Sequence, residues 1–151
     1  MTRVSIGIRR GRGGHAGDVE LILQVPSDLA LVAEAVELVT EHTPAGILSP
    51  RRVQFNLRTV LAEALANAIT YGNREDPTKH VEVRVEARRE AIRVTVIDAG
   101  EGFDPSRVPD PTTPDAVERE VGRGLFVIRH LVDAVDFNAK GNAVCLTLRA
   151  G

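Results

Sequence analysis

Alternating apolar and polar positions predict the strands of this chain. From residue 19 to residue 25 every second side chain is a Val or Leu, the pattern of a strand with one buried face, and Pro26 closes the run. The same alternation recurs in two pairs of segments: 81–87 with 92–96, and 135–138 with 144–148. Because a short turn at 88–91 and Gly141-Asn142 join the members of each pair, both pairs predict hairpins.

Three other segments repeat apolar residues at helical spacing. The first runs from Leu29 to Val39, with Ser27 or Asp28 as its N-cap, and stops at the breaker Thr43-Pro44-Ala45-Gly46. The second has Ser49 as N-cap, Pro50 in its first turn and an apolar stripe from Leu57 to Ile69, and it ends near Gly72 and Asn73. The third is marked by Leu125, Ile128, Leu131 and Val132.

These elements predict an α+β fold. About five strands form a mixed, mostly antiparallel sheet with three helices on one face, a two-layer sandwich that occupies residues 18–150 as a single domain. Residues 1–17, rich in Arg and Gly, are expected to be a flexible basic tail outside the fold. A basic arm that touches nucleic acid or an acidic partner is the alternative interpretation of this tail.

Composition narrows the class of protein. The 151 residues hold one Cys, Cys145, which excludes an intramolecular disulfide, so a cytoplasmic setting is expected. No apolar run is long enough to span a bilayer, so no membrane is expected. The formal net charge of -2 gives no overall basic field, and direct binding to nucleic acid is not expected.

The second helix carries two polar residues one turn apart, Glu63 and Asn67. They border the apolar stripe, since residues four apart lie on one face of a helix. A carboxylate can accept a proton, and an amide oxygen is a neutral ligand that suits Mg²⁺. On this helix alone, an ordinary solvent-facing Glu and Asn is the better interpretation.

A carboxylate also stands at the end of the strand before residue 98. Asp98 is followed by Gly100 and Gly102, which permit a close approach of backbone and ligand. Asp98 could accept a hydrogen bond from an exocyclic amine. A plain surface turn has the same composition, so the segment is not specific by itself.

The third segment is Gly122-Arg123-Gly124, which is expected to open the third helix. Free N–H groups at a helix start, together with the helix dipole, suit a nucleotide phosphate, and Arg123 adds charge. A dinucleotide fingerprint is excluded because Val127 stands where its third Gly is required. The chain also lacks a P-loop, so any nucleotide site is of another kind.

In this order and spacing, the three segments resemble the ATPase superfamily that contains DNA gyrase, histidine kinases and mismatch-repair ATPases (GHKL), and within it the bacterial anti-sigma factor serine kinases. The resemblance covers residues 19–148. It implies a Bergerat-type ATP site in which Glu63 is the catalytic base and Asn67 the Mg²⁺ ligand. Asp98 would bind the adenine amine, Gly100 and Gly102 would shape the pocket, and the Pro-rich loop that follows would act as a lid.

The same resemblance implies that Gly122, Arg123 and Gly124 lie at the triphosphate. It departs at Tyr71, where many relatives have His, and at the bulky Arg123 between the two glycines. The implied function is that of an ATP-dependent anti-sigma factor and serine/threonine kinase. It would phosphorylate a Ser or Thr of a small antagonist protein and regulate a sigma factor or a stress response.

Two alternative functions compete with that of an anti-sigma factor kinase. A free-standing histidine-kinase domain is disfavoured, because the 18 residues before Val19 cannot supply a dimerising segment with a phosphoacceptor His. A binding module that uses ATP only to present a partner surface remains open. Relatives commonly form dimers, so a homodimer also remains open, with the helix from Leu29 to Val39 as one surface for it.

Overall fold

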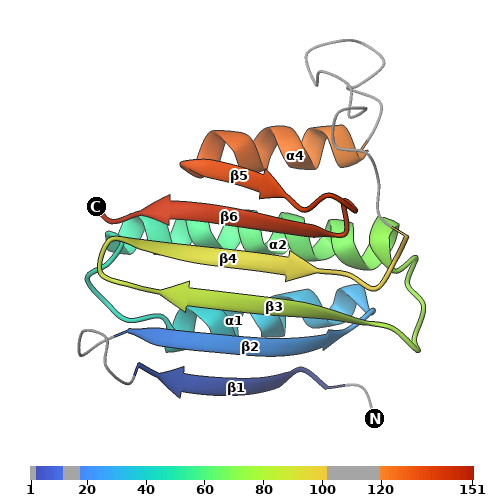
Figure 1. Cartoon of the computed structure of the whole chain (residues 1–151), viewed down its shortest axis with the longest axis horizontal. Coiled ribbons are helices and arrows are strands. Elements are labelled where there is room, and N and C mark those ends of the chain that lie inside the picture. Colours follow the sequence, from blue (N-terminus) through green and yellow to red (C-terminus); the bar gives the residue numbers. More distant parts are fainter. Residues whose placement is uncertain (1–2, 12–17, 102–119) are drawn as a thin grey trace.

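The computed structural model describes residues 3–11, 18–101 and 120–151, and for residues 120–123 the backbone alone. Six strands form one sheet in the order β1-β2-β3-β4-β6-β5 (Figure 1). Their bounds are β1 Ser5–Arg10, β2 Val19–Pro26, β3 His80–Ala87, β4 Ala91–Ile97, β5 Ala134–Phe137 and β6 Ala143–Arg149. Every strand pairing within the described ranges is antiparallel, so the sheet shown there is not mixed.

Both predicted hairpins are confirmed. β3 and β4 pair with Val83 opposite Val96 and Val85 opposite Val94, which puts their apolar side chains on one face. Reciprocal backbone hydrogen bonds of 3.0 and 3.3 Å between Arg88 and Ala91 close the turn. The alternating pattern therefore set the register, because a slip by one residue would expose the whole apolar row.

The prediction of a tail outside the fold is wrong for residues 5–10. These residues form β1, which pairs with β2 along its whole length at the edge of the sheet. Val4 and Ile6 also pack against the core. The strand buries little, so its composition resembles that of a tail, but an edge strand is held chiefly by backbone hydrogen bonds to its neighbour. Residues 12–17 lie outside the described part.

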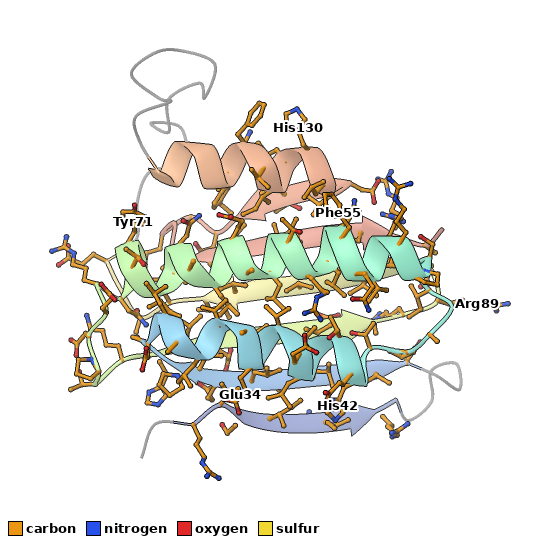
Figure 2. The ribbon with its side chains drawn as sticks, turned by 180° about the vertical axis from the view of Figure 1, so that it is seen from behind. Glu34, His42, Phe55, Tyr71, Arg89 and His130 are labelled. Carbon is orange, nitrogen blue, oxygen red and sulfur yellow. The ribbon has the colours of Figure 1, made fainter. Side chains whose placement is uncertain are left out.

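The helices cover one face of the sheet, as Figure 2 shows from behind. Their bounds are η1 Leu29–Leu31, α1 Val32–His42, η2 Arg52–Leu57, α2 Arg58–Asn67, η3 Ala68–Gly72 and α4 Glu120–Leu131. α2 lies between α1 and α4 and contacts both. No described helix combines the length and the apolar character needed to cross a membrane.

The predicted caps of the first two helices are observed. Asp28 accepts a hydrogen bond of 2.9 Å from the Ala30 N–H, and the Ser49 hydroxyl accepts one of 3.2 Å from the Arg52 N–H. The turns on both sides of α2, η2 and η3, are π-helical, which the sequence pattern does not reveal. Such widened turns are frequent at functional sites, and η3 follows Asn67 directly.

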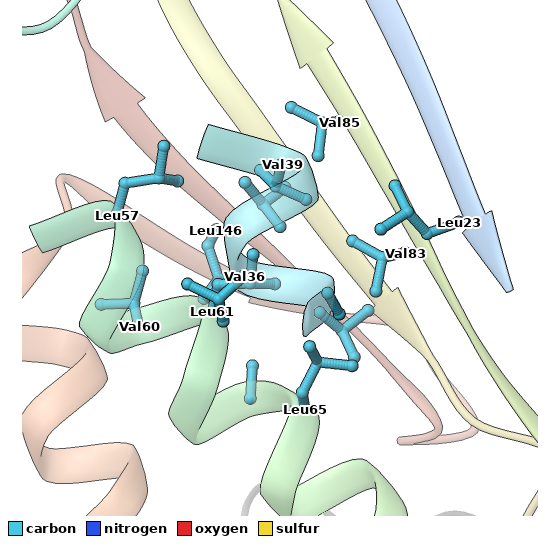
Figure 3. Packing of buried hydrophobic residues seen from close by; sticks show 14 of the residues in the cluster. Leu23, Val36, Val39, Leu57, Val60, Leu61, Leu65, Val83, Val85 and Leu146 are labelled. Atoms are coloured by element: carbon cyan, nitrogen blue, oxygen red, sulfur yellow. The ribbon is translucent and has the colours of Figure 1, made fainter. Parts of the chain in front are cut away.

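The core fills the space between helices and sheet (Figure 3). α2 contributes Leu61 and Leu65, α1 contributes Val36 and Val39, and the sheet contributes inward side chains such as Leu23. Leu61, Leu65, Val39 and Leu23 have no solvent exposure. Because α2 is buried along this face, its polar edge is held in a fixed orientation relative to β4 and α4.

Candidate functional site

Glu63 and Asn67 lie together on the edge of α2 that faces α4. Both are partly buried, and Gly124 of α4 is buried against them. A Cβ at Gly124 would lie 3.0 Å from the Asn67 Nδ2 and 3.2 Å from the Glu63 Oε2, closer than ordinary packing allows. The missing side chain at Gly124 therefore lets the backbone of α4 approach these two polar groups.

Asp98 lies against η3, the turn that follows α2. It comes directly after β4, and a Cβ at Gly72 would collide with the Asp98 Cγ, Oδ2 and Cβ atoms. A Cβ at Gly100 would likewise collide with the Gly72 carbonyl. The two glycines are thus needed so that η3 and the loop after β4 can touch.

η3 connects these two groups of residues. It begins at Ala68, directly after Asn67, and ends at Gly72. The Asn73 N–H donates to the Ala68 carbonyl at 2.8 Å, an i to i−5 bond of the widened turn. One turn of helix therefore carries the chain from the Glu63 and Asn67 edge to the contact with Asp98.

Hydrogen bonds hold the Asp98 loop from several sides. The Asp98 Oδ1 accepts the Gly100 N–H at 2.8 Å. The Asp98 N–H donates to the Asn142 carbonyl at 2.9 Å, and the Asn142 Nδ2 donates to the Asp98 carbonyl at 3.0 Å. Burial raises the pKa of the Asp98 carboxyl, against the opposing effects of the Gly100 N–H and of the Lys140 and Lys79 charges.

The raised pKa predicts a cost in stability. Above its pKa the Asp98 carboxylate is charged and partly desolvated in the folded state, so ionisation favours unfolding. Asp98→Asn keeps the shape and removes the charge, and it should therefore raise the free energy of unfolding at pH 7. The difference from wild type should shrink as pH falls through the pKa of Asp98, where the wild-type side chain becomes neutral. Urea denaturation of both proteins at several pH values measures this difference. A wild-type protein that is more stable than Asp98→Asn at pH 7 would contradict the prediction that the charged Asp98 carboxylate destabilises the fold.

The glycine segment opens the described part of the third helix, as expected. α4 begins at Glu120, so Gly122 and Gly124 stand within its first turns. The N–H of Gly124 is therefore in position for an intrahelical bond. Of Gly122 and Arg123 only the helical backbone is described, and Gly102 with the rest of the predicted lid lies outside the described residues.

Sequence reasoning missed two features of the site. Gly72 was interpreted as a helix end, although it also contacts Asp98. Asn73 was interpreted in the same way, but its side chain is buried and accepts a hydrogen bond from the loop after β4. The pairing of Gly72 with a carboxylate 26 residues later leaves no periodic signal. Tyr71, beside them, is 45% exposed in η3, at the end of the long helix that η2, α2 and η3 form together (Figure 2).

The described fold is an antiparallel sheet with helices on one face, and the sequence contains no P-loop. Residues 25–148 match the model of the histidine kinase-like ATPase domain. The chain belongs to this family, which confirms the resemblance seen in the sequence, and an ATPase-domain family implies ATP as the ligand.

Curated relatives have more specific names. An anti-sigma F factor of Anoxybacillus flavithermus is 32% identical over 89 residues, which are 57% of this chain and 60% of that protein. The serine-protein kinase RsbW of Oceanobacillus iheyensis is 29% identical over 89 residues, 55% of this chain and 56% of that protein. An anti-sigma F factor of the same organism is 30% identical over 97 residues, 60% of this chain and 66% of that protein. The chain therefore spans less than two thirds of the length of these relatives.

Proposed function

We propose that this protein is an anti-sigma factor with Mg²⁺-dependent serine/threonine kinase activity, which phosphorylates a small antagonist protein with ATP. The observation that carries the proposal is the meeting of Glu63 and Asn67 with Gly124, one widened turn away from Asp98. The names of the similar proteins, an anti-sigma F factor and a serine-protein kinase, support the same function.

The residues present suit an adenine nucleotide with a metal ion. When bound, Mg²⁺ and ATP supply the transferable phosphoryl group and the positive charge that offsets negative charge on it. Asn67 would hold the metal through its amide oxygen, the kind of donor that Mg²⁺ prefers. Asp98 would accept a hydrogen bond from the adenine amine. Gly122 and Arg123 would contact the phosphates, and Gly100 and Gly102 would border the pocket.

Glu63 would act on the attacking hydroxyl. It lies one turn before Asn67 on the same edge, so a group held at the Asn67 amide is within reach of its carboxylate. A carboxylate there can take the proton of a Ser or Thr hydroxyl as the new P–O bond forms. This role separates a kinase from a module that only binds nucleotide.

The proposed partners are a sigma factor and an antagonist that carries the phosphorylated Ser or Thr. With these partners, the protein would regulate a sigma factor or a stress response in the cytoplasm. The exposed side of η1 and α1 offers one surface for the antagonist or for a second copy of the chain, because Leu29 at the start of η1 is 44% exposed. A homodimer is compatible with this arrangement.

Adenine recognition by Asp98 predicts a preference for ATP over inosine triphosphate, which carries a carbonyl in place of the amine. That carbonyl would face the Asp98 carboxylate, and an unpaired buried acceptor costs about 1–3 kcal/mol. ATP should therefore bind about 5- to 150-fold more tightly than inosine triphosphate at neutral pH, by titration calorimetry with Mg²⁺. Equal affinities would refute the role of Asp98.

A phosphotransfer assay tests the kinase activity. The protein is incubated with γ-labelled ATP, Mg²⁺ and small antagonist proteins of the same genome, each beside a variant whose acceptor Ser is replaced by Ala. We expect label on one antagonist and none on its Ser→Ala variant. Tight ATP binding without label on any antagonist would favour the nucleotide-gated binding module.

A further inference from the structure

Two polar side chains are buried within the described residues, and they contact each other. Asn73 is 1% exposed and Ser27 is 5% exposed. The Asn73 Nδ2 donates to the Ser27 hydroxyl at 3.0 Å, and this hydroxyl donates to the Lys79 carbonyl at 2.6 Å. The pair thus links the end of η3 to the segment after β2 and to the residue before β3.

The other end of the Asn73 amide reaches the proposed adenine site. Its Oδ1 accepts the Ala99 N–H at 2.7 Å. Ala99 follows Asp98, so this N–H belongs to the peptide unit between them. Asn142 holds the carbonyl of the same unit at 3.0 Å. Both polar atoms of this peptide unit are therefore fixed, one by Asn73 and the other by Asn142.

Fixing this peptide unit fixes the backbone torsion of Asp98. A planar peptide held at its N–H and its carbonyl cannot rotate freely, so the Asp98 side chain starts from a defined backbone direction. Without the Asn73 oxygen, the Ala99 N–H would lose its partner in a partly buried place, and the loop would relax to find another.

We propose that Asn73, supported by Ser27, is a positioning residue for adenine recognition. It does not touch the nucleotide, and it acts by holding the Asp98–Ala99 peptide so that the Asp98 carboxylate faces the exocyclic amine. The inference rests on the proposed ATP site, and it adds a determinant of base selectivity outside the three motifs.

A purely structural role would have a different signature. A buried amide that only stabilises the fold would, when lost, weaken the binding of every nucleotide alike. A positioning role acts through Asp98, so its loss should affect the binding of ATP more than that of inosine triphosphate. It should also disappear when Asp98 is absent, because residues that act through one another are not additive.

The experiment is a double-mutant cycle read out as the ratio of ATP to inosine triphosphate affinity. Calorimetry is done on wild type, Asn73→Ala, Asp98→Ala and the double variant, with Asn56→Ala as the matched control. Asn56 lies at the other end of the long helix and donates to the Leu131 carbonyl at 2.9 Å. Asn73→Ala should lower the affinity ratio by about five-fold or more, and Asn56→Ala should leave it unchanged.

In the Asp98→Ala background, Asn73→Ala should change the affinity ratio no further. An equal loss for both nucleotides, or a ratio that falls by the same factor without Asp98, would overturn the positioning role. A wild-type ratio near one would overturn the adenine assignment and the role of Asn73 together. A normal wild-type ratio that Asn73→Ala preserves would overturn the role of Asn73 alone.

Ser27→Ala provides a milder variant in case Asn73→Ala does not fold. It keeps the bond from Ala99 to Asn73 and removes the hydroxyl that orients the amide. The affinity ratio should fall in the same direction by a smaller factor, and exchange of the Ala99 amide proton should become faster. A folded Ser27→Ala protein with the wild-type ratio and unchanged exchange would overturn the inference.

Discussion

Glu63→Gln is expected to slow phosphoryl transfer to the antagonist by about 10²–10⁴-fold, the usual range for loss of a general base. The Kd for ATP should stay close to that of wild type. Gln retains the size and the position of the side chain and loses the basic carboxylate, so the substitution tests proton acceptance and not packing. Initial rates with γ-labelled ATP, together with calorimetric binding, measure both quantities.

Glu90→Gln is the matched control for this experiment. Glu90 is an exposed carboxylate in the turn between β3 and β4, at the opposite end of β4 from Asp98. The same chemical change at this position should leave the transfer rate unaltered. If Glu63→Gln phosphorylates the antagonist at the wild-type rate, Glu63 is not the base.

Asn67→Ala is expected to weaken both binding and transfer. Loss of the amide oxygen removes a metal ligand. Even the loss of a residue that only hydrogen-bonds to a metal ligand typically lowers metal affinity by about 10- to 100-fold. We expect a reduction of at least this size in the Mg²⁺-dependent affinity for ATP, with a larger loss in transfer rate because charge compensation fails there as well. Titrations with ATP in the presence of Mg²⁺ and of EDTA separate the metal-dependent part.

The control for Asn67→Ala is again Asn56→Ala. Both positions lie on the long helix, and the Asn56 amide bonds to α4 through the Leu131 carbonyl. Asn56→Ala should lower the free energy of unfolding by about 1 kcal/mol without a change in the Mg²⁺ dependence of binding. An Asn67→Ala protein that binds ATP as tightly as wild type with Mg²⁺, and loses as much affinity as wild type with EDTA, would remove Asn67 from the metal site.

The sequence predicts most of the fold because one face of the sheet is buried. Alternation of apolar and polar residues located β2 to β6, and the caps at Asp28 and Ser49 located two helices. β1 was missed because its stabilisation comes from backbone pairing, to which side-chain composition gives little clue. Its sequence, rich in Gly and Arg, is equally suitable for a tail.

The site was predictable in its parts and not in its connections. Glu63 and Asn67 could be placed on one helical edge because helix geometry is regular. The approach of Gly124 to them, and of Gly72 to Asp98, depends on how distant segments pack. The π-helical turn η3, which connects the two groups, has no signature in the residue spacing.

The hydrogen bond from Asn73 to Ser27 was likewise not predictable from the sequence. The two residues are 46 positions apart and hydrogen-bond only because β2 and η3 end at the same edge of the fold. Each residue type is also common at helix ends, so local interpretation assigns both to capping or termination. Burial revealed their role, since a buried polar pair needs partners on every side.

Asn67, the loop after β4 and Gly124 are proposed to form a single adenine nucleotide site. NMR titration of the labelled protein with Mg²⁺ and ATP tests this proposal. The amide signals of Asp98, Gly100 and Gly124 and the side-chain amide of Asn67 are expected to shift together, with one common Kd. Signals that stay unmoved at these residues while others shift, or groups that saturate with different Kd values, would contradict it.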